Sequence, residues 1–162
     1  MFINLPILYN AISKNYLTVV EAVNLLNSNV KKFNLNDELL IELNLLDSDK
    51  NAFLQVLKEH IKANNLEQGI DYPSITDDIY QLTQLINIKN KNISIRQKLE
   101  DIANCWPDFN YPQKWRSFIY YMPSEKEETS EDTLYLKFLS FIRDEKHRLS
   151  KLLQSKVKVE GI

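Results

Sequence analysis

Apolar residues recur every three or four positions along most of the chain, and this spacing predicts α-helices. In one segment, Val19, Ala22, Val23, Leu26 and Val30 lie at helical spacing, and similar stripes follow in later segments. We expect helices at about residues 6–13, 18–30, 36–46, 49–63, 74–89, 93–106, 112–122 and 131–153.

Polar and proline residues mark the ends of these predicted helices. Thr18 and Glu21 have the spacing of a capping box, in which each residue bonds the backbone of the other. Residues 66–74 predict a loop because they contain Gly69 and Pro73, so Ser74 or Thr76 is expected to cap the next helix. The other prolines predict one helix end at 107, a helix start at 112 and a second end at 123.

The expected fold is all-α. About seven to eight helices with short links should pack as antiparallel helical hairpins in a single domain spanning residues 1–162. A helical-repeat-like arrangement stays open, although no sequence period supports a true solenoid. The C-terminal residues 155–162 alternate apolar and polar side chains without an obvious partner strand, and we interpret residues 154–162 as a frayed tail.

Composition limits the fold classes and the cellular compartments that we expect for the protein. Only two of 162 residues are glycine, which argues against a hairpin-rich sheet and against a glycine-rich phosphate loop. No segment resembles a signal peptide or a membrane span, and Cys105 is the only cysteine. We therefore expect a cytoplasmic protein that has no membrane association.

Few residues have the spacing that catalysis requires. His60 has no second histidine one turn away, and the pair Asp144 and His147 is more typical of a solvated, charge-rich helix than of a metal site or a catalytic base. Cys105 lacks a neighbouring base, so a buried structural thiol is the simpler interpretation. The sequence thus predicts no enzyme activity, no cofactor, no metal and no small-molecule ligand.

The segment at 105–124, CWPDFNYPQKWRSFIYYMPS, holds both tryptophans of the chain. Its prolines predict a corner followed by a short helix. Trp106 and Trp115 are then expected to anchor this corner on the core, while Tyr111, Lys114 and Tyr120 keep a polar end in solvent.

Charge is divided unevenly between the two halves of the chain. Residues 1–81 carry six lysines and eleven acids, a balance of −5, whereas residues 82–162 carry fourteen bases and eleven acids, a balance of +3. A pI of 5.7 argues against nucleic-acid binding by the whole chain. Acids at helix starts serve as caps, but they can also form a negative surface for a basic partner. The candidate partner-binding residues are Asp37, Glu38, Asp47, Asp49, Asp77 and Asp78.

Three segments carry a resemblance: YLTVVEAVNLL at 16–26, NDELLIELNLLDSD at 36–49 and DFNYPQKWRSFIYYMP at 108–123. They resemble a family of small bacterial helical proteins that includes immunity proteins of polymorphic or contact-dependent toxins. The resemblance implies a protein that binds and neutralises a cognate toxin, with no catalytic residue or cofactor. A basic nuclease is the expected toxin because an acidic inhibitor could mask its substrate-binding or active site. A non-enzymatic helical adaptor that binds an endogenous protein is the alternative.

Overall fold

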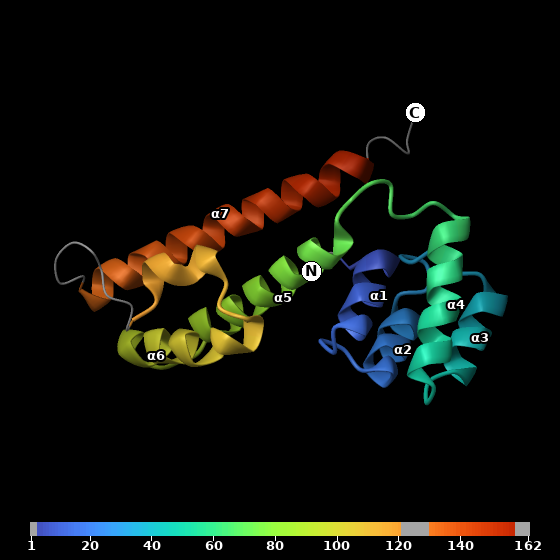
Figure 1. Cartoon of the computed structure of the whole chain (residues 1–162), viewed down its shortest axis with the longest axis horizontal. Coiled ribbons are helices and arrows are strands. Elements are labelled where there is room, and N and C mark those ends of the chain that lie inside the picture. Colours follow the sequence, from blue (N-terminus) through green and yellow to red (C-terminus); the bar gives the residue numbers. More distant parts are fainter. Residues whose placement is uncertain (1–2, 121–129, 158–162) are drawn as a thin grey trace. The chain divides into compact units, whose positions relative to one another are not determined.

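The computed structural model describes residues 3–120 and 130–157, and for 155–157 it describes the backbone alone. Within these residues all regular structure is helical, which confirms the predicted all-α fold (Figure 1). The elements are α1 (Leu5–Ser13), α2 (Val19–Ser28), α3 (Asp37–Leu45), α4 (Lys50–Ala63), α5 (Tyr72–Lys89), α6 (Ile95–Cys105), the short 3-10 helices η1 (Pro107–Phe109) and η2 (Gln113–Phe118), and α7 (Glu131–Val157).

Contacts divide the chain into two compact units. The first unit is Met1–Thr76 and the second unit is Asp77–Ile162, so the boundary falls within the first turns of α5. The prediction of a single domain over 1–162 stays a prediction.

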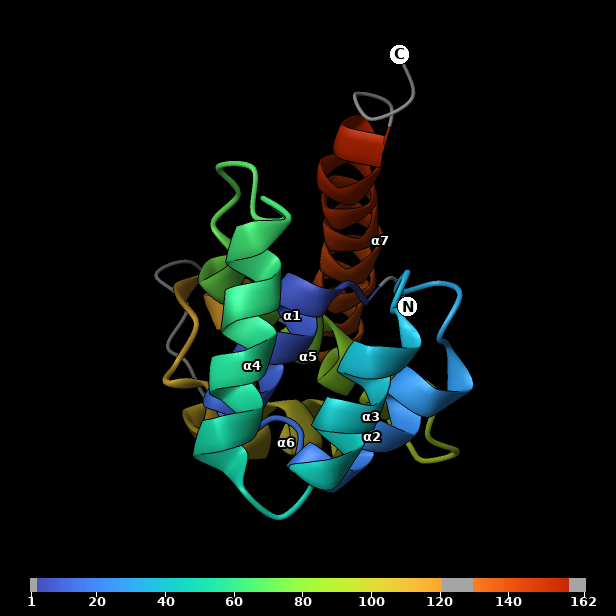
Figure 2. The same cartoon turned by 90° about the vertical axis from the view of Figure 1, so that its right-hand side faces the viewer.

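Helices α1 to α4 form the body of the first unit. Each contacts its neighbour in sequence, and α1 also packs against α4, so the four helices close into a bundle (Figure 2). This return contact differs from a solenoid, in which each repeat touches only the next. The centre of the bundle is aliphatic with two phenylalanines, and its fully buried members include Leu8, Leu26, Leu43, Phe53 and Leu57.

The second unit is organised around a cluster of aromatic rings. Phe118, on η2, packs against Phe138 and Phe141 of α7 with ring centroids 5.7 and 5.3 Å apart, and Trp115 lies 6.3 Å away on its other side. Leu99 and Ile102 of α6 are fully buried in the same unit. Aromatic pairs at these separations add to the free energy gained by burial.

Side-chain caps explain where several helices begin. The Thr18 hydroxyl accepts a hydrogen bond from the Glu21 amide at 3.2 Å, and the Glu21 carboxylate accepts one from the Thr18 amide at 2.8 Å, which confirms the capping box. Asn36, Asp49 and Ser94 cap α3, α4 and α6 in the same manner, as single side-chain acceptors.

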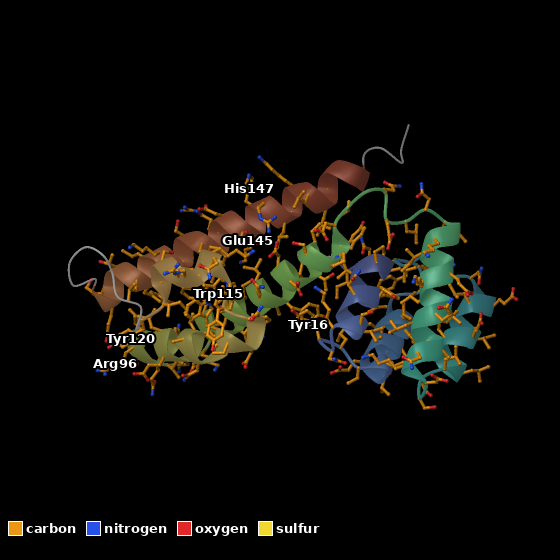
Figure 3. All side chains as sticks on the ribbon, viewed as in Figure 1. Tyr16, Arg96, Trp115, Tyr120, Glu145 and His147 are labelled. Atoms are coloured by element: carbon orange, nitrogen blue, oxygen red, sulfur yellow. The ribbon has the colours of Figure 1, made fainter. Side chains whose placement is uncertain are left out.

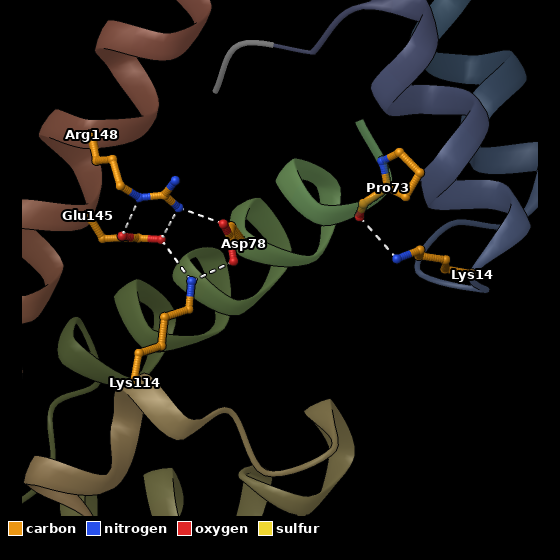
Figure 4. A network of polar contacts seen from close by, with 6 residues as sticks. All are labelled: Lys14, Pro73, Asp78, Lys114, Glu145 and Arg148. Carbon is orange, nitrogen blue, oxygen red and sulfur yellow. Dashed lines mark hydrogen bonds and ion pairs between the residues drawn. The ribbon is translucent and has the colours of Figure 1, made fainter. Parts of the chain in front are cut away.

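The start of α5 differs from the prediction. The helix begins at Tyr72, because the Asp71 carboxylate accepts a hydrogen bond from the Ser74 amide at 3.2 Å and acts as the cap. Neither Ser74 nor Thr76 has this role, and Pro73 lies within the first turn, where its missing N–H has no cost. Lys14 of α1 donates to the Pro73 carbonyl at 3.0 Å and holds this turn within the first unit (Figure 4).

Helix α7 is longer than the sequence predicted. It continues through residues 154–157, which we had placed in a frayed tail. The sequence offers no glycine or proline that would stop a helix before Gly161. The predicted helix end at Pro123 and the tail residues 158–162 lie outside the described residues.

Asparagine ends several helical segments in place of glycine. Four asparagines adopt left-handed backbone conformations with φ between 49° and 62°: Asn15, Asn34, Asn65 and Asn110. At the end of α4, the amide of Asn65 donates to the carbonyl of Lys62, and the amide of Leu66 donates to that of Ile61, both at 3.1 Å. This pair of bonds is the Schellman motif, and the other three asparagines repeat it.

The residue after each of these asparagines is large and apolar: Tyr16, Leu35, Leu66 and Tyr111. After η1, the Trp106 and Tyr111 rings meet edge to face, with centroids 5.1 Å apart and planes at 84°. An asparagine followed by a large apolar residue therefore ends α1, α4 and η1.

None of the described helices has a stretch both long and apolar enough to span a lipid bilayer.

Candidate functional site

The outer face of α3 combines exposed aliphatic side chains with carboxylates. Leu39 and Leu43 point into the first unit, whereas Ile41 and Leu45 are 62% and 78% exposed. The exposed positions Glu38, Ile41, Glu42 and Leu45 have the spacing i, i+3, i+4 and i+7, so they form one stripe along the helix. We call this stripe the α3 face.

The carboxylates of the α3 face are free to meet a partner. Asp37 and Glu38 are exposed in the first turn of α3, where the helix dipole favours negative charge, and Glu42 is exposed one turn later. Among the residues that the structure describes, no base forms an ion pair with any of the three.

Asp47 and Asp49 lie at the other end of α3. Both are exposed, and the Asp49 carboxylate accepts a hydrogen bond from the Ala52 amide at 3.1 Å, as the cap of α4. A helix of nine residues separates them from Asp37 and Glu38, a distance of about 14 Å along the axis. These four candidate acids therefore lie at opposite ends of α3, and they do not gather at one set of neighbouring helix ends.

Asp78 belongs to an ion-pair network in the second unit, together with Lys114, Glu145 and Arg148 (Figure 4). Lys114 Nζ lies 2.5 Å from Asp78 Oδ1 and 3.1 Å from Glu145 Oε1. Arg148 Nη2 lies 2.5 Å from Asp78 Oδ2 and 2.6 Å from Glu145 Oε1. The network joins α5, η2 and α7, so the charge of Asp78 is already balanced within the unit.

Burial and charge act in opposite directions on Glu145, whose side chain is only 8% exposed. Burial alone would raise the pKa of its carboxyl, but hydrogen bonds from Arg148 and Lys114 lower that pKa below the usual value. Its hydrogen bond to Glu145 in turn raises the pKa of Arg148. Glu145 and Arg148 are therefore both charged at neutral pH.

Sequence reasoning missed Lys114, Glu145 and Arg148 as partners of Asp78. One signal was available: Phe138, Ile142 and Leu149 define the buried stripe of α7, and Glu145 occupies the same face between them. A carboxylate on a core-facing stripe needs a base as its partner. Helical spacing cannot identify Lys114 as that base, because Lys114 is distant in sequence from Glu145. Asp77, the neighbour of Asp78, is half-buried.

The residues considered for catalysis do not form a reactive centre. The Cys105 thiol is buried and donates to the Ile102 carbonyl at 3.4 Å, and burial raises the pKa of this thiol to about 11. Asp144 pairs with Arg143 at 3.3 Å, and His147 is exposed on α7. Among the described residues, no group of three side chains could hold a metal ion.

The aromatic corner has the predicted roles, with one exception. Trp106 and Trp115 are buried, and the Trp106 indole donates to the Pro112 carbonyl at 3.0 Å. Tyr111 and Tyr120 are exposed, and Tyr120 is labelled in Figure 3. Lys114 is exposed too, but its ammonium pairs with Asp78 and Glu145 and does not end in solvent as predicted. The corner is therefore part of the core, and residues 121–124 of this segment lie outside the described residues.

Comparison with protein families identifies one relationship. Residues 1–146 match the model of a family described as "Uncharacterized protein conserved in bacteria (DUF2247)". The chain belongs to this family. The resemblance to a bacterial family without an assigned role is confirmed in that form, and the family description contains no link to immunity proteins. No curated protein and no solved structure matches the chain.

Proposed function

We propose that this protein is an inhibitor that binds a basic cognate toxin, of the nuclease type, and neutralises it in the cytoplasm by covering its substrate-binding or active site. The α3 face carries the proposal. It presents Ile41 and Leu45 to solvent one turn apart, on the same stripe as the unpaired carboxylates of Glu38 and Glu42.

Such a face has the two components that a protein interface uses. Burying an aliphatic side chain of this size on association contributes about 1.5–3 kcal/mol before the entropic costs of binding. Carboxylates around it raise the association rate with a positively charged partner and disfavour acidic ones. Nuclease toxins suit this chemistry because their substrate-binding surfaces are positively charged to hold phosphates.

Inhibition of this kind needs no catalytic group on the inhibitor. A stable scaffold and one partner-specific surface are sufficient, and the buried Cys105 thiol is consistent with that requirement. The charge balance of −5 over residues 1–81 adds a long-range attraction for a basic partner.

The deciding experiment uses the product of the gene immediately upstream. The two proteins are produced together, and we expect them to purify as a complex whose nuclease activity on DNA and RNA is suppressed. Adding the inhibitor to the separately purified toxin should then abolish cleavage at equimolar ratio. If the upstream product neither binds nor is inhibited, the immunity proposal is wrong, and capture of an endogenous protein through the α3 face would instead support a helical adaptor.

A further inference from the structure

The outer side of α7 carries an open groove that has no part in the proposed inhibition. Its volume is about 770 Å³, and all of its lining residues belong to the second unit. Leu136 and Leu139 supply apolar surface, and Ser140 and Ser150 supply hydroxyls, whereas Ile142 also lines the groove but is only 2% exposed. The rest of the lining is basic: Lys89 at the end of α5, and Arg143, Lys146 and His147 on α7.

The charge of this groove is of one sign. Among the residues that the structure describes, the lining contains no carboxylate, although the chain as a whole carries a net charge of −2. Asp144 pairs with Arg143 from outside the groove at 3.3 Å, and Ser140 accepts from Arg143 Nη2 at 3.2 Å. Asp144 thus offsets part of the positive charge of Arg143, although its carboxylate does not line the groove.

The groove follows one continuous face of α7. Positions 136, 139, 140, 143, 146, 147 and 150 recur at steps of three and four, and they lie beside the buried stripe that contains Glu145. From Leu136 to Ser150 the helix rises about 21 Å. Lys146 and His147 are exposed, and Leu136 is 65% exposed, so the track is long and open to solvent.

A track of this shape suits a polymer segment more than a compact metabolite, because small-molecule sites enclose most of their ligand. The lining residues also indicate which of two acidic polymers, a single-stranded nucleic acid or an acidic polypeptide, fits the groove better. Proteins that hold single-stranded nucleic acid stack the bases on aromatic side chains, and the described part of this lining contains no tryptophan, tyrosine or phenylalanine. Aliphatic side chains beside lysine and arginine instead match a polypeptide in which leucine-like residues alternate with carboxylates.

We propose that the α7 groove binds an acidic amphipathic segment of a protein partner, with apolar side chains against Leu136 and Leu139 and carboxylates on Lys89, Arg143, Lys146 and His147. This is the helix-in-groove mode of recognition, in which apolar anchors at i, i+3, i+4 and i+7 give affinity and charges fix orientation. The groove and the α3 face lie on different units and select partners of opposite charge, so this site is independent of toxin binding.

The test measures binding of a fluorescein-labelled peptide of about 14 residues, long enough to follow the track as a helix, in which pairs of leucine alternate with pairs of glutamate. Fluorescence anisotropy with the full-length protein should show micromolar affinity that weakens as salt increases. The double variant R143Q/K146Q should bind at least about tenfold more weakly, and Leu136→Gln about threefold more weakly.

The matched control is K137Q/K151Q, which removes two exposed bases of α7 that do not line the groove. It should bind the peptide within about twofold of the unchanged protein. Circular dichroism at increasing temperature should show that all variants remain folded, since the substituted side chains are exposed. Equal weakening in both double variants would reveal non-specific attraction and overturn the proposal.

Two other probes complete the design. The same peptide with lysine in place of glutamate should not bind. A single-stranded oligothymidylate that binds more tightly than the acidic peptide, and loses affinity in R143Q/K146Q, would overturn the proposal in favour of a nucleic-acid groove. Absence of binding by the acidic peptide would also overturn it.

Discussion

Arg148 donates two hydrogen bonds to the carboxylate of Glu145, one turn earlier on α7: Nε lies 2.9 Å from Oε2, and Nη2 lies 2.6 Å from Oε1. The same guanidinium reaches Asp78 on α5, and Lys114 on η2 completes an alternating set of two acids and two bases. Three elements that are distant in sequence are therefore held together by charges whose side chains are 8–44% exposed.

Replacing Glu145 with glutamine should lower the free energy of unfolding at pH 7 by about 1–3 kcal/mol, because it removes the buried carboxylate that accepts hydrogen bonds from the partly exposed bases Lys114 and Arg148. The pKa of Glu145 lies below its usual value of 4.5, so its contribution is complete above about pH 4.5 and is lost as pH falls through the folded-state pKa. The difference between the two proteins should therefore shrink on acidification.

Urea unfolding followed by circular dichroism at pH 7 and at acidic pH would measure both effects. The control is Glu100→Gln, which breaks an exposed pair with Arg96 and should cost no more than about 0.5 kcal/mol. A Glu145 variant as stable as the unchanged protein at neutral pH would contradict this account of the network.

Asp78 is expected to affect stability and not partner binding. Asp78→Asn should lower the free energy of unfolding by about 1–3 kcal/mol, since it removes the charge on which Lys114 and Arg148 both converge. Its effect should be non-additive with that of Glu145→Gln, because the two carboxylates share both bases. Asp132→Asn, at an exposed position early in α7, is the control and should change neither stability nor binding. Weakened toxin binding by folded Asp78→Asn would contradict this assignment.

Charge reversal on α3 should weaken the toxin complex while leaving the fold intact. We expect D37K/E38K to reduce the affinity at least about tenfold, mainly through the association rate. The loss of favourable charges at the helix N-terminus should cost no more than about 1 kcal/mol of stability. Asp47→Lys tests the other end of α3, whereas Asp49 is better replaced by asparagine, which preserves the cap.

The control for these reversals is E59K/E67K, an equal charge change at exposed positions of the same unit. Surface plasmon resonance at two salt concentrations should show a smaller effect for this control. If the control weakens binding as much as D37K/E38K does, net charge and not the α3 face attracts the partner.

The left-handed asparagines predict that the substitution of asparagine by alanine changes stability in a way that depends on the backbone conformation at the site. Asn65→Ala should destabilise the protein by about 1 kcal/mol, because alanine tolerates a positive φ poorly, whereas Asn65→Gly should stay within about 0.5 kcal/mol of the unchanged protein. Asn51→Ala, the same substitution at an exposed position inside α4, should be neutral or slightly stabilising. Thermal unfolding of the three variants would show whether the motif at the end of α4 depends on backbone conformation.

Local patterns predicted the helices well because their signals are contained in a few neighbouring residues. Thr18 with Glu21, and Asp49 before α4, are examples in which a cap and its target lie three residues apart. The start of α5 was predicted too late because Ser74 and Asp71 both suit a cap, and only the folded chain shows that Asp71 takes the role.

The candidate sites also contain some features that local sequence patterns predict and others that only the folded chain shows. The exposed acids of α3 could be predicted as surface residues, but the exposure of Ile41 and Leu45 could not, because leucine and isoleucine are usually buried. The pairing of Asp78 depends on Lys114 and Arg148, 36 and 70 positions away, and no periodicity relates such residues.

The asparagine stops also bear on how the chain folds. Their backbone hydrogen bonds join residues three and five positions apart. The ring contact of Trp106 with Tyr111 also spans five positions. Contacts this local can form on the microsecond timescale of single helices, well before distant segments meet. The lengths of α1 and α4 are thus set early, and the slower steps of folding only need to arrange helices whose ends are already defined.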